Sequence, residues 1–256
     1  MITNHRVAAL ARAEAVLLRR NPSALAGALV GPLSLVLIPL ANSPAPGSEG
    51  NPGAGAELLV GLTTFSLILG VYYNLVTALV ARRDEFVLKR LRTGEIADAE
   101  ILLGTAAPGV LIAWGQIGIG VVAGFLLLDL RAPDNPAWLL LAGVGLVAGT
   151  ALCILLAAAV TAVTGTVETA QLTATPLLVL SLTFSGALFP LADLPGVWPW
   201  ITQCLPLSPV VDLVRLGLTG SPSSGDAVPR AVLILGLWFV AGAWSVRRWF
   251  RWEPRR

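Results

Sequence analysis

Long apolar runs alternate with short polar segments along the whole chain. A helix needs roughly 20 residues to cross about 30 Å of hydrocarbon, and within lipid a helix satisfies its own backbone hydrogen bonds. Runs of about this length, almost free of charged side chains, therefore predict membrane-spanning helices. They lie at residues 24–40, 58–80, 101–128, 138–164, 170–189 and 228–246.

The composition agrees with this pattern. Charged residues make up 12% of the chain, against about 25% in soluble domains, and hydrophobic residues make up 55%. The mean hydropathy is +0.79. These values exclude an ordinary water-soluble fold and predict an all-α integral membrane protein.

The cationic side chains are unevenly divided between the two sides of the predicted bundle. With six spans, both termini lie on one side, and that side holds fourteen of the seventeen Lys and Arg residues. The other side holds Arg131, Arg215 and Arg230. Because cytoplasmic segments carry the excess of Lys and Arg, we expect both termini and residues 81–100 in the cytoplasm. The predicted location is the plasma (inner) membrane.

The segment before the first run, residues 1–23, has an amphipathic pattern. Val7 and Leu17 fall on one helical arc, with Arg12 and Arg19 opposite. We expect a helix lying in the cytoplasmic interface. Two alternatives stay open: a basic flank that only sets topology, and a signal peptide that includes the first apolar run.

The outer segment at residues 190–227 is long and still partly apolar. Its stretches 197–205 and 208–218 are too short to span, which is typical of interfacial or re-entrant helices. We expect a re-entrant helical hairpin between the fifth and sixth spans, and an ordinary cap over the helix ends is the alternative. Asp212 and Arg215 stand three residues apart here and have the spacing of a helical ion pair.

Glycine pairs at a spacing of four punctuate the spans, at Gly27 and Gly31, Gly120 and Gly124, and Gly145 and Gly149. Such pairs let helices approach closely. We expect most of them to pack helices within one subunit.

The residues for several kinds of chemistry are missing. The only lysine, Lys89, follows Leu88, so the chain has no phosphate-binding loop of the type that ends in Gly-Lys-Ser/Thr. The predicted spans hold no carboxylate or histidine relay for protons, and no metal set is evident. The pattern favours a transport channel without its own motor; sodium coupling at broken helices, and a membrane-embedded enzyme acting on lipid, remain as alternatives.

The densest cluster of charge lies between the second and third runs, in ARRDEFVLKRLRTGEIADAEILLG at residues 81–104. Acidic residues, then LKRLRTG, then EILLG resemble the cytoplasmic signature of the ABC-2 type exporter permeases. The block FSGALFPLADLPGVWPWITQCLPLSPVVDLVR at residues 184–215 is similar to that family's outer hairpin block. Both blocks stand where a six-span order requires them, so the resemblance covers essentially the whole chain, residues 1–256, as a single domain.

This resemblance implies an exporter subunit that works as a pair of six-span chains with two copies of a separate ATP-binding subunit. It implies a homodimer, ATP and Mg²⁺ bound by the partner rather than by this chain, and no nucleic-acid partner. The cytoplasmic loop would form a coupling helix on the ATPase, and a simple solvated loop is the alternative. The residues expected to dock are Arg83, Glu85, Phe86, Lys89, Arg90, Leu91, Arg92 and Gly94.

The docking turn departs from the family pattern. Phe86 and Val87 stand where the family commonly has Gly-Thr, and Glu95 stands where a proline often follows. Contacts at this turn are therefore expected to be specific to this pair of subunits.

The cargo class follows from the almost charge-free spans. A strongly charged cargo needs pairing groups along its path, so these spans favour an amphipathic or hydrophobic small molecule, a drug or antibiotic, or a lipid-linked cargo. Tyr72, Tyr73, Asn74 and Gln116 are the candidates to line the route. Each is equally a candidate for helix packing or an interhelical hydrogen bond.

Overall fold

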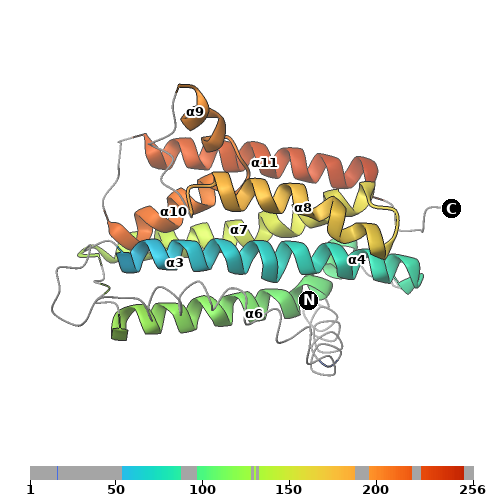
Figure 1. Cartoon of the computed structure of the whole chain (residues 1–256), viewed down its shortest axis with the longest axis horizontal. Coiled ribbons are helices and arrows are strands. Elements are labelled where there is room, and N and C mark those ends of the chain that lie inside the picture. The colour runs from blue at the N-terminus through green and yellow to red at the C-terminus, as the bar shows by residue number, and fades with distance from the viewer. Residues whose placement is uncertain are drawn as a thin grey trace.

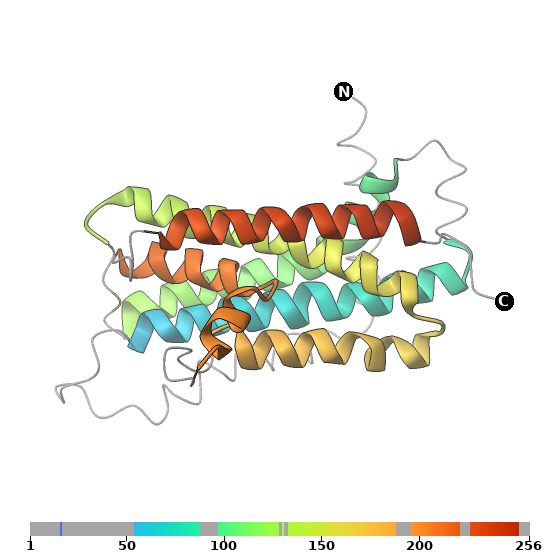
Figure 2. The same cartoon turned by 90° about the horizontal axis from the view of Figure 1, so that it is seen from above.

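A computed structural model describes residue 16 and residues 54–87, 97–127, 130, 133–187, 196–220 and 226–250. The regular elements in these ranges are helices, and they form five continuous helical stretches that are long and apolar enough to cross a membrane. The long helices run side by side (Figure 1; Figure 2). The protein is therefore an α-helical multi-pass membrane protein.

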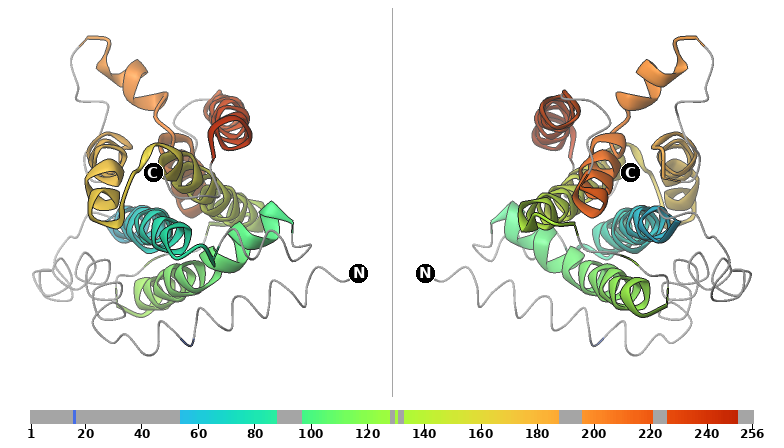
Figure 3. Two further views of the ribbon diagram at one scale, coloured as in Figure 1. Left: turned by 90° about the vertical axis from the view of Figure 1, so that its right-hand side faces the viewer. Right: turned by 90° about the vertical axis from the view of Figure 1, so that its left-hand side faces the viewer.

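The second predicted span is one continuous helical rod from residue 54 to residue 84. It consists of α3 (Ala54–Phe65), the π-helix η1 (Ser66–Tyr73) and α4 (Asn74–Asp84). The rod contacts four other helices, namely α6 (Asp98–Leu127), α7 (Pro136–Val163), α8 (Val167–Phe184) and α10 (Ser208–Thr219). Figure 3 shows it in the middle of the bundle. Its side chains form much of the core, including Leu67, Ile68, Tyr72, Val76 and Leu79, which are all 0% exposed.

The other long helices each leave an aliphatic face uncovered. Leu126 on α6, Leu140 on α7, Leu172 on α8 and Val240 on α11 (Ala227–Trp249) are each at least 70% exposed. In a multi-pass protein such faces meet lipid, which is as apolar as leucine. Of the five described spans the central rod is the most buried, and the helices around it carry apolar outer faces that suit lipid.

The described spans agree with the sequence pattern, with shifted ends. Residues 58–80 lie within the rod 54–84, and residues 101–128, 138–164 and 228–246 match α6, α7 and α11. The predicted span 170–189 is wrong at its end, because α8 ends at Phe184 and Gly186 adopts a left-handed conformation at φ 81°. The span 24–40 lies outside the described residues, as does the interfacial helix 1–23 apart from residue 16, which is helical.

The outer segment contains two short helices at the places the pattern predicts. Helix α9 (Trp198–Gln203) is followed by α10, which ends at Gly220 with φ 64°. A left-handed glycine is a common helix terminator. Helix α10 is largely buried against α7, α11 and α3, whereas α9 exposes Trp198 and Trp200. The depth of this pair in the membrane stays a prediction.

Side-chain caps explain where α7 and α8 begin. The Asn135 side chain accepts a hydrogen bond from the backbone of Ala137 at 2.9 Å, and Pro136 occupies the first helical position of α7. Thr166 caps α8 through a reciprocal arrangement with Thr169. The α6–α7 and α7–α8 connections are both short, so α7 lies antiparallel beside α6 and also beside α8.

The described glycine pairs pack helices inside this chain, as expected. A side chain on Gly120 would collide with Leu62 of α3, and one on Gly149 would meet Val210 of α10 at 2.6 Å. Another close approach joins α7 to α10, where a Cβ on Gly217 would lie 2.5 Å from the backbone nitrogen of Ala142. These glycines let the outer helix α10 seat directly on α7.

Candidate functional site

The segment between α4 and α6, which the sequence predicts to be cytoplasmic, begins with an exposed turn at the end of the central rod. After α4 ends at Asp84, the backbone N–H of Phe86 donates to the Arg83 carbonyl at 3.0 Å. Phe86 has φ 58°, a left-handed value that is uncommon for a bulky residue, and its side chain is 55% exposed. Glu85 beside it is also exposed. The turn therefore presents a carboxylate and an aromatic ring to the surroundings.

The described structure resumes where α6 begins. The backbone N–H of Ala97 donates to Oε2 of Glu100 at 3.1 Å, and Asp98 and Glu100 lie in the first turn. Acidic side chains stabilise a helix N-terminus through its dipole. The expected docking residues Lys89, Arg90, Leu91, Arg92 and Gly94 lie outside the described residues.

Arg83, also expected in the docking set, is buried within the subunit with 0% exposure. Its Nη1 donates to the Thr161 carbonyl at 3.0 Å, and its Nη2 donates to the carbonyls of Thr164 and Gly165 at 2.8 and 3.0 Å. The acceptors lie at the C-terminal end of α7 and in the turn to α8. The Arg83 guanidinium is thus bound within the chain and is not exposed on the surface beside Glu85 and Phe86.

The four candidate cargo-path residues occupy different environments. The hydroxyl of Tyr72 is buried and donates to the Ala174 carbonyl of α8 at 3.1 Å, so this side chain holds η1 against α8. Gln116 is buried in α6 with 0% exposure. Tyr73 is half-buried, and Asn74 is exposed, with its amide donating to the Gly70 carbonyl at 3.3 Å. Tyr72 therefore has a packing role, and Tyr73 and Asn74 keep accessible surface.

At the outer end, Arg215 of α10 joins three elements. Its guanidinium donates to both carboxylate oxygens of Glu57 on α3, at 2.8 and 2.9 Å, and to the Gly186 carbonyl after α8. Two parallel bonds of this kind fix geometry as well as adding energy. The guanidinium of Arg215 thus forms a bidentate pair with Glu57 on another helix, and its charge also attracts Asp212 one turn away on α10.

Asp212 lies one helical turn from Arg215 and is half-buried. Burial raises the pKa of its carboxyl above the ordinary value, because desolvation disfavours the charged form. The neighbouring cations of Arg215 and Arg230 oppose this shift. The side chain is therefore a charge held in a partly apolar setting at the outer end of the bundle.

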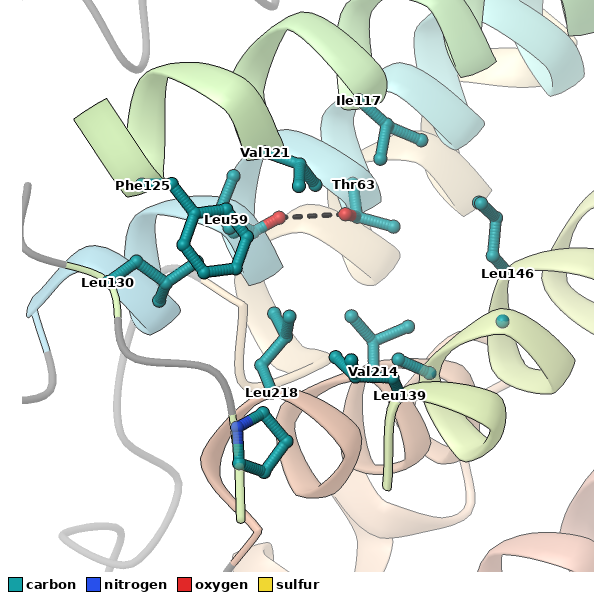
Figure 4. Close-up of a pocket in the computed structure, with 13 residues that line it drawn as sticks. Leu59, Thr63, Ile117, Val121, Phe125, Leu130, Leu139, Leu146, Val214 and Leu218 are labelled. Atoms are coloured by element: carbon teal, nitrogen blue, oxygen red, sulfur yellow. Dashed lines mark hydrogen bonds between the residues drawn. The ribbon is translucent and has the colours of Figure 1, made fainter. Parts of the chain in front are cut away.

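A cavity of about 220 Å³ lies between α3, α6, α7 and α10 in the half of the bundle that carries these outer elements (Figure 4). Its one hydroxyl belongs to Thr63, which donates to the Leu59 carbonyl of its own helix at 2.7 Å. An apolar cavity of about 150 Å³ already stays dry and binds small apolar molecules. The lining residues are Leu59, Thr63, Ile117, Val121, Phe125, Leu130, Pro133, Leu139, Ala142, Gly143, Leu146, Val214 and Leu218.

Sequence reasoning missed Glu57, the cavity and the inward direction of Arg83. For Arg83 a signal was available, because it continues the buried stripe of Tyr72, Val76 and Leu79 at helical spacing. The cavity left no such signal, since its walls come from four helices and a connection whose residues look like ordinary span residues.

These features define a class of protein: a helical multi-pass membrane protein whose central rod ends in an exposed turn and whose opposite end holds an apolar cavity. The chain belongs to the ABC-2 type transporter family, whose model matches residues 5–219. It is therefore the membrane-spanning permease of an ABC-type transporter, a family that generally pairs with an ATP-binding subunit. A comparison with curated proteins found no match.

Proposed function

We propose that the protein is the permease subunit of an exporter, which moves its cargo outward and is powered by a separate ATPase subunit. Two copies of this chain would form a homodimer with two ATPase subunits, which bind the ATP and Mg²⁺. The observation that carries the proposal is the exposed turn at Glu85 and Phe86. This turn directly follows the buried central rod, and it lies within the residues that the family model covers.

The docking surface consists of this turn and the basic residues after it. Phe86 offers an apolar contact, and Arg90 and Arg92 would meet acidic groups of the ATPase. Lys89, Leu91 and Gly94 complete the set. Since hot spots at interfaces are enriched in aromatic and arginine side chains, this composition suits a specific contact.

The cargo is an amphipathic or hydrophobic small molecule or lipid. The apolar cavity supports this part of the proposal, because it offers an entering molecule no ion pair, and the hydroxyl of Thr63 is already engaged with its own helix. Apolar surface is therefore what the cavity accepts.

The export proposal places the turn at Glu85 and Phe86 in the cytoplasm of the cell and the cavity near the outer face of the plasma (inner) membrane. The distribution of Lys and Arg supports this orientation.

The first test is copurification. The chain is expressed with the ATPase encoded beside its own gene, and the complex is isolated through a tag on the permease. A stable complex with equal amounts of the two subunits supports the proposal. If no ATPase copurifies, or if purified permease alone turns over a lipid without nucleotide, the proposal fails.

The second test reverses charge at the docking surface. The variant Arg90→Glu with Arg92→Glu is expected to insert normally but to lose the ATPase on purification. Arg247→Glu with Arg248→Glu is the matched control, because these exposed arginines lie at the end of α11 and carry the same change of charge. Equal loss of the ATPase in both variants would contradict a local docking role.

A further inference from the structure

The side chain of Arg83 joins the end of the central rod to the α7–α8 turn. Arg83 has 0% exposure, whereas Arg82 and Asp84 on either side of it are partly exposed. Its guanidinium spans the three carbonyls of Thr161, Thr164 and Gly165. The fastening is therefore deep and has several contacts.

The chemistry of the acceptors explains why a cation is buried here. The last four carbonyls of a helix lack partners within that helix, and the C-terminus carries a partial negative charge. Helix α7 ends at Val163, so the Thr161 carbonyl is one of this set. The carboxylate of Asp84 also lies 3.9 Å from Nε of Arg83. The planar guanidinium fork matches several acceptors at once, which a lysine ammonium does not.

This contact lies between the exposed turn after α4 and the start of α8. Arg83 stands immediately before the docking turn at Glu85 and Phe86. On the other side of the contact, the Thr164 hydroxyl lies 2.8 Å from the Thr173 hydroxyl of α8, which ties the turn to that helix.

Helix α7 continues from this contact to the outer end. It has no proline beyond its first position, Pro136, and it carries α10 on Gly145 and Gly149. Because α7 is a continuous helix, a displacement of its cytoplasmic end would be transmitted to α10 at the other end.

We propose that Arg83 transmits the movement of the docking turn to α7 and α8, so that the end of α4 and the α7–α8 turn move as one body during transport. This rests on the proposed function, since it needs an ATPase that moves the docking turn. Arg83 is then a positioning residue that contacts neither cargo nor nucleotide.

The direct test measures a distance in the complex with its ATPase. Cys153 and Cys204 are replaced, and spin labels are placed at Ala81 near the end of α4 and at Glu168 on α8. With Arg83 present, the distance between the labels is expected to stay the same in the nucleotide-free and ATP-bound states. A distance that changes between these states overturns the proposal without any substitution at Arg83.

The variant test separates transmission from docking. Arg83→Met is expected to keep copurification and basal ATPase activity, but stimulation of the ATPase by an amphipathic drug that stimulates the unaltered complex should fall about fivefold or more, the usual size of an allosteric coupling. The distance distribution between labels 81 and 168 should broaden. Arg83→Lys should restore part of the stimulation, and Arg82→Met, the matched control, should leave both readouts unchanged.

The outcomes are distinguishable. If the unaltered chain fails to bind an ATPase, the proposed function fails. If the unaltered chain binds it and Arg83→Met loses binding, Arg83 belongs to the docking surface and the transmission role is overturned. Full stimulation with a narrow distance distribution in Arg83→Met overturns it as well. If Arg83→Met does not insert, the distance measurement with Arg83 present decides.

Discussion

Charged residues on and around α10 differ in how far their side chains are buried. Arg215 is 29% exposed and binds Glu57, which is 52% exposed, so water screens this pair and its contribution to stability is modest. Asp212 on the same helix is more enclosed and lies near two cations. The balance of burial and attraction at Asp212 can be measured.

The stability contributed by Asp212 is expected to depend on pH. Its folded pKa is raised, so the folded state holds the proton more tightly than the unfolded state does. The cost of burying the carboxylate is fully present above the raised pKa and is relieved as pH falls through it toward the ordinary value of 3.8. Asp212→Asn should therefore melt at a higher temperature than the unaltered protein at pH 7, and the difference should shrink on acidification.

Thermal unfolding in detergent between pH 4 and pH 8 checks this expectation. Asp134→Asn is the control, because it removes the same charge from an exposed position. A melting difference for Asp212→Asn that is constant across this range would show that ionisation of Asp212 does not limit stability.

The cavity offers a test at a single glycine. Gly143 lines the cavity, and a Cβ added there meets no atom within 4 Å. Gly143→Leu is thus expected to fill the cavity without moving the backbone and to reduce drug-stimulated ATPase activity several-fold. Gly236→Leu on α11 is the matched control, because its Cβ is equally unobstructed and it is not among the lining residues. Equal activity in both variants would remove the cavity from the cargo route.

At the level of elements, the contact between α7 and α10 is the closest backbone approach involving the outer helices. A Cβ on Gly217 would lie 2.5 Å from both the Cβ and the backbone nitrogen of Ala142, and 2.6 Å from the Trp138 carbonyl. Two of these three atoms belong to the backbone of α7, so they cannot give way by a change of rotamer. The seat of α10 therefore depends on this glycine.

Gly217→Ala should separate α10 from α7 and lower stability by about 1–3 kcal/mol, as overpacked cores do. Gly118→Ala is the control, since a Cβ there meets nothing within 4 Å and helix propensity favours alanine by about 1 kcal/mol. Melting temperatures in detergent compare the two variants. A Gly217→Ala variant that melts as high as Gly118→Ala would show that the helices have room to adjust.

The predictability of each element follows from the physics that forms it. Spans such as α7 and α11 were predictable because a helix that crosses the bilayer must be apolar over its whole length, and this is visible directly in the sequence. The π-helical segment η1 was not, since its residues SLILGVYY also suit an ordinary α-helix, and its backbone spacing arises where Gly70 packs on Gly109 and Ala113 of α6. Helix α10 was predictable in place, but its burial depends on Gly217 meeting a particular part of α7.

For the whole molecule, the orientation inferred from Lys and Arg can be tested with a native thiol. Cys204 is exposed just beyond α9, whereas Cys153 is buried in α7. We expect a membrane-impermeant maleimide to label intact cells at Cys204. In a chain with Cys204→Ser, a cysteine introduced at Glu168 should react only after lysis. Labelling of Glu168→Cys in intact cells would reverse the orientation and the export proposal with it.

The burial of Arg83 has a consequence for how the chain is made. Its carbonyl acceptors lie 78 to 82 residues further along the chain, so they have not yet been synthesised when the second span enters the bilayer. In the orientation that the Lys and Arg distribution predicts, the guanidinium is during that interval one of the positive charges that keep this end of the span on the cytoplasmic side. Only after the fourth span, α7, has been inserted can the Arg83 guanidinium leave water and bind the carbonyls at the C-terminal end of that helix. One arginine thus first helps to set the topology of the second span during biosynthesis, and later joins two helices in the folded protein.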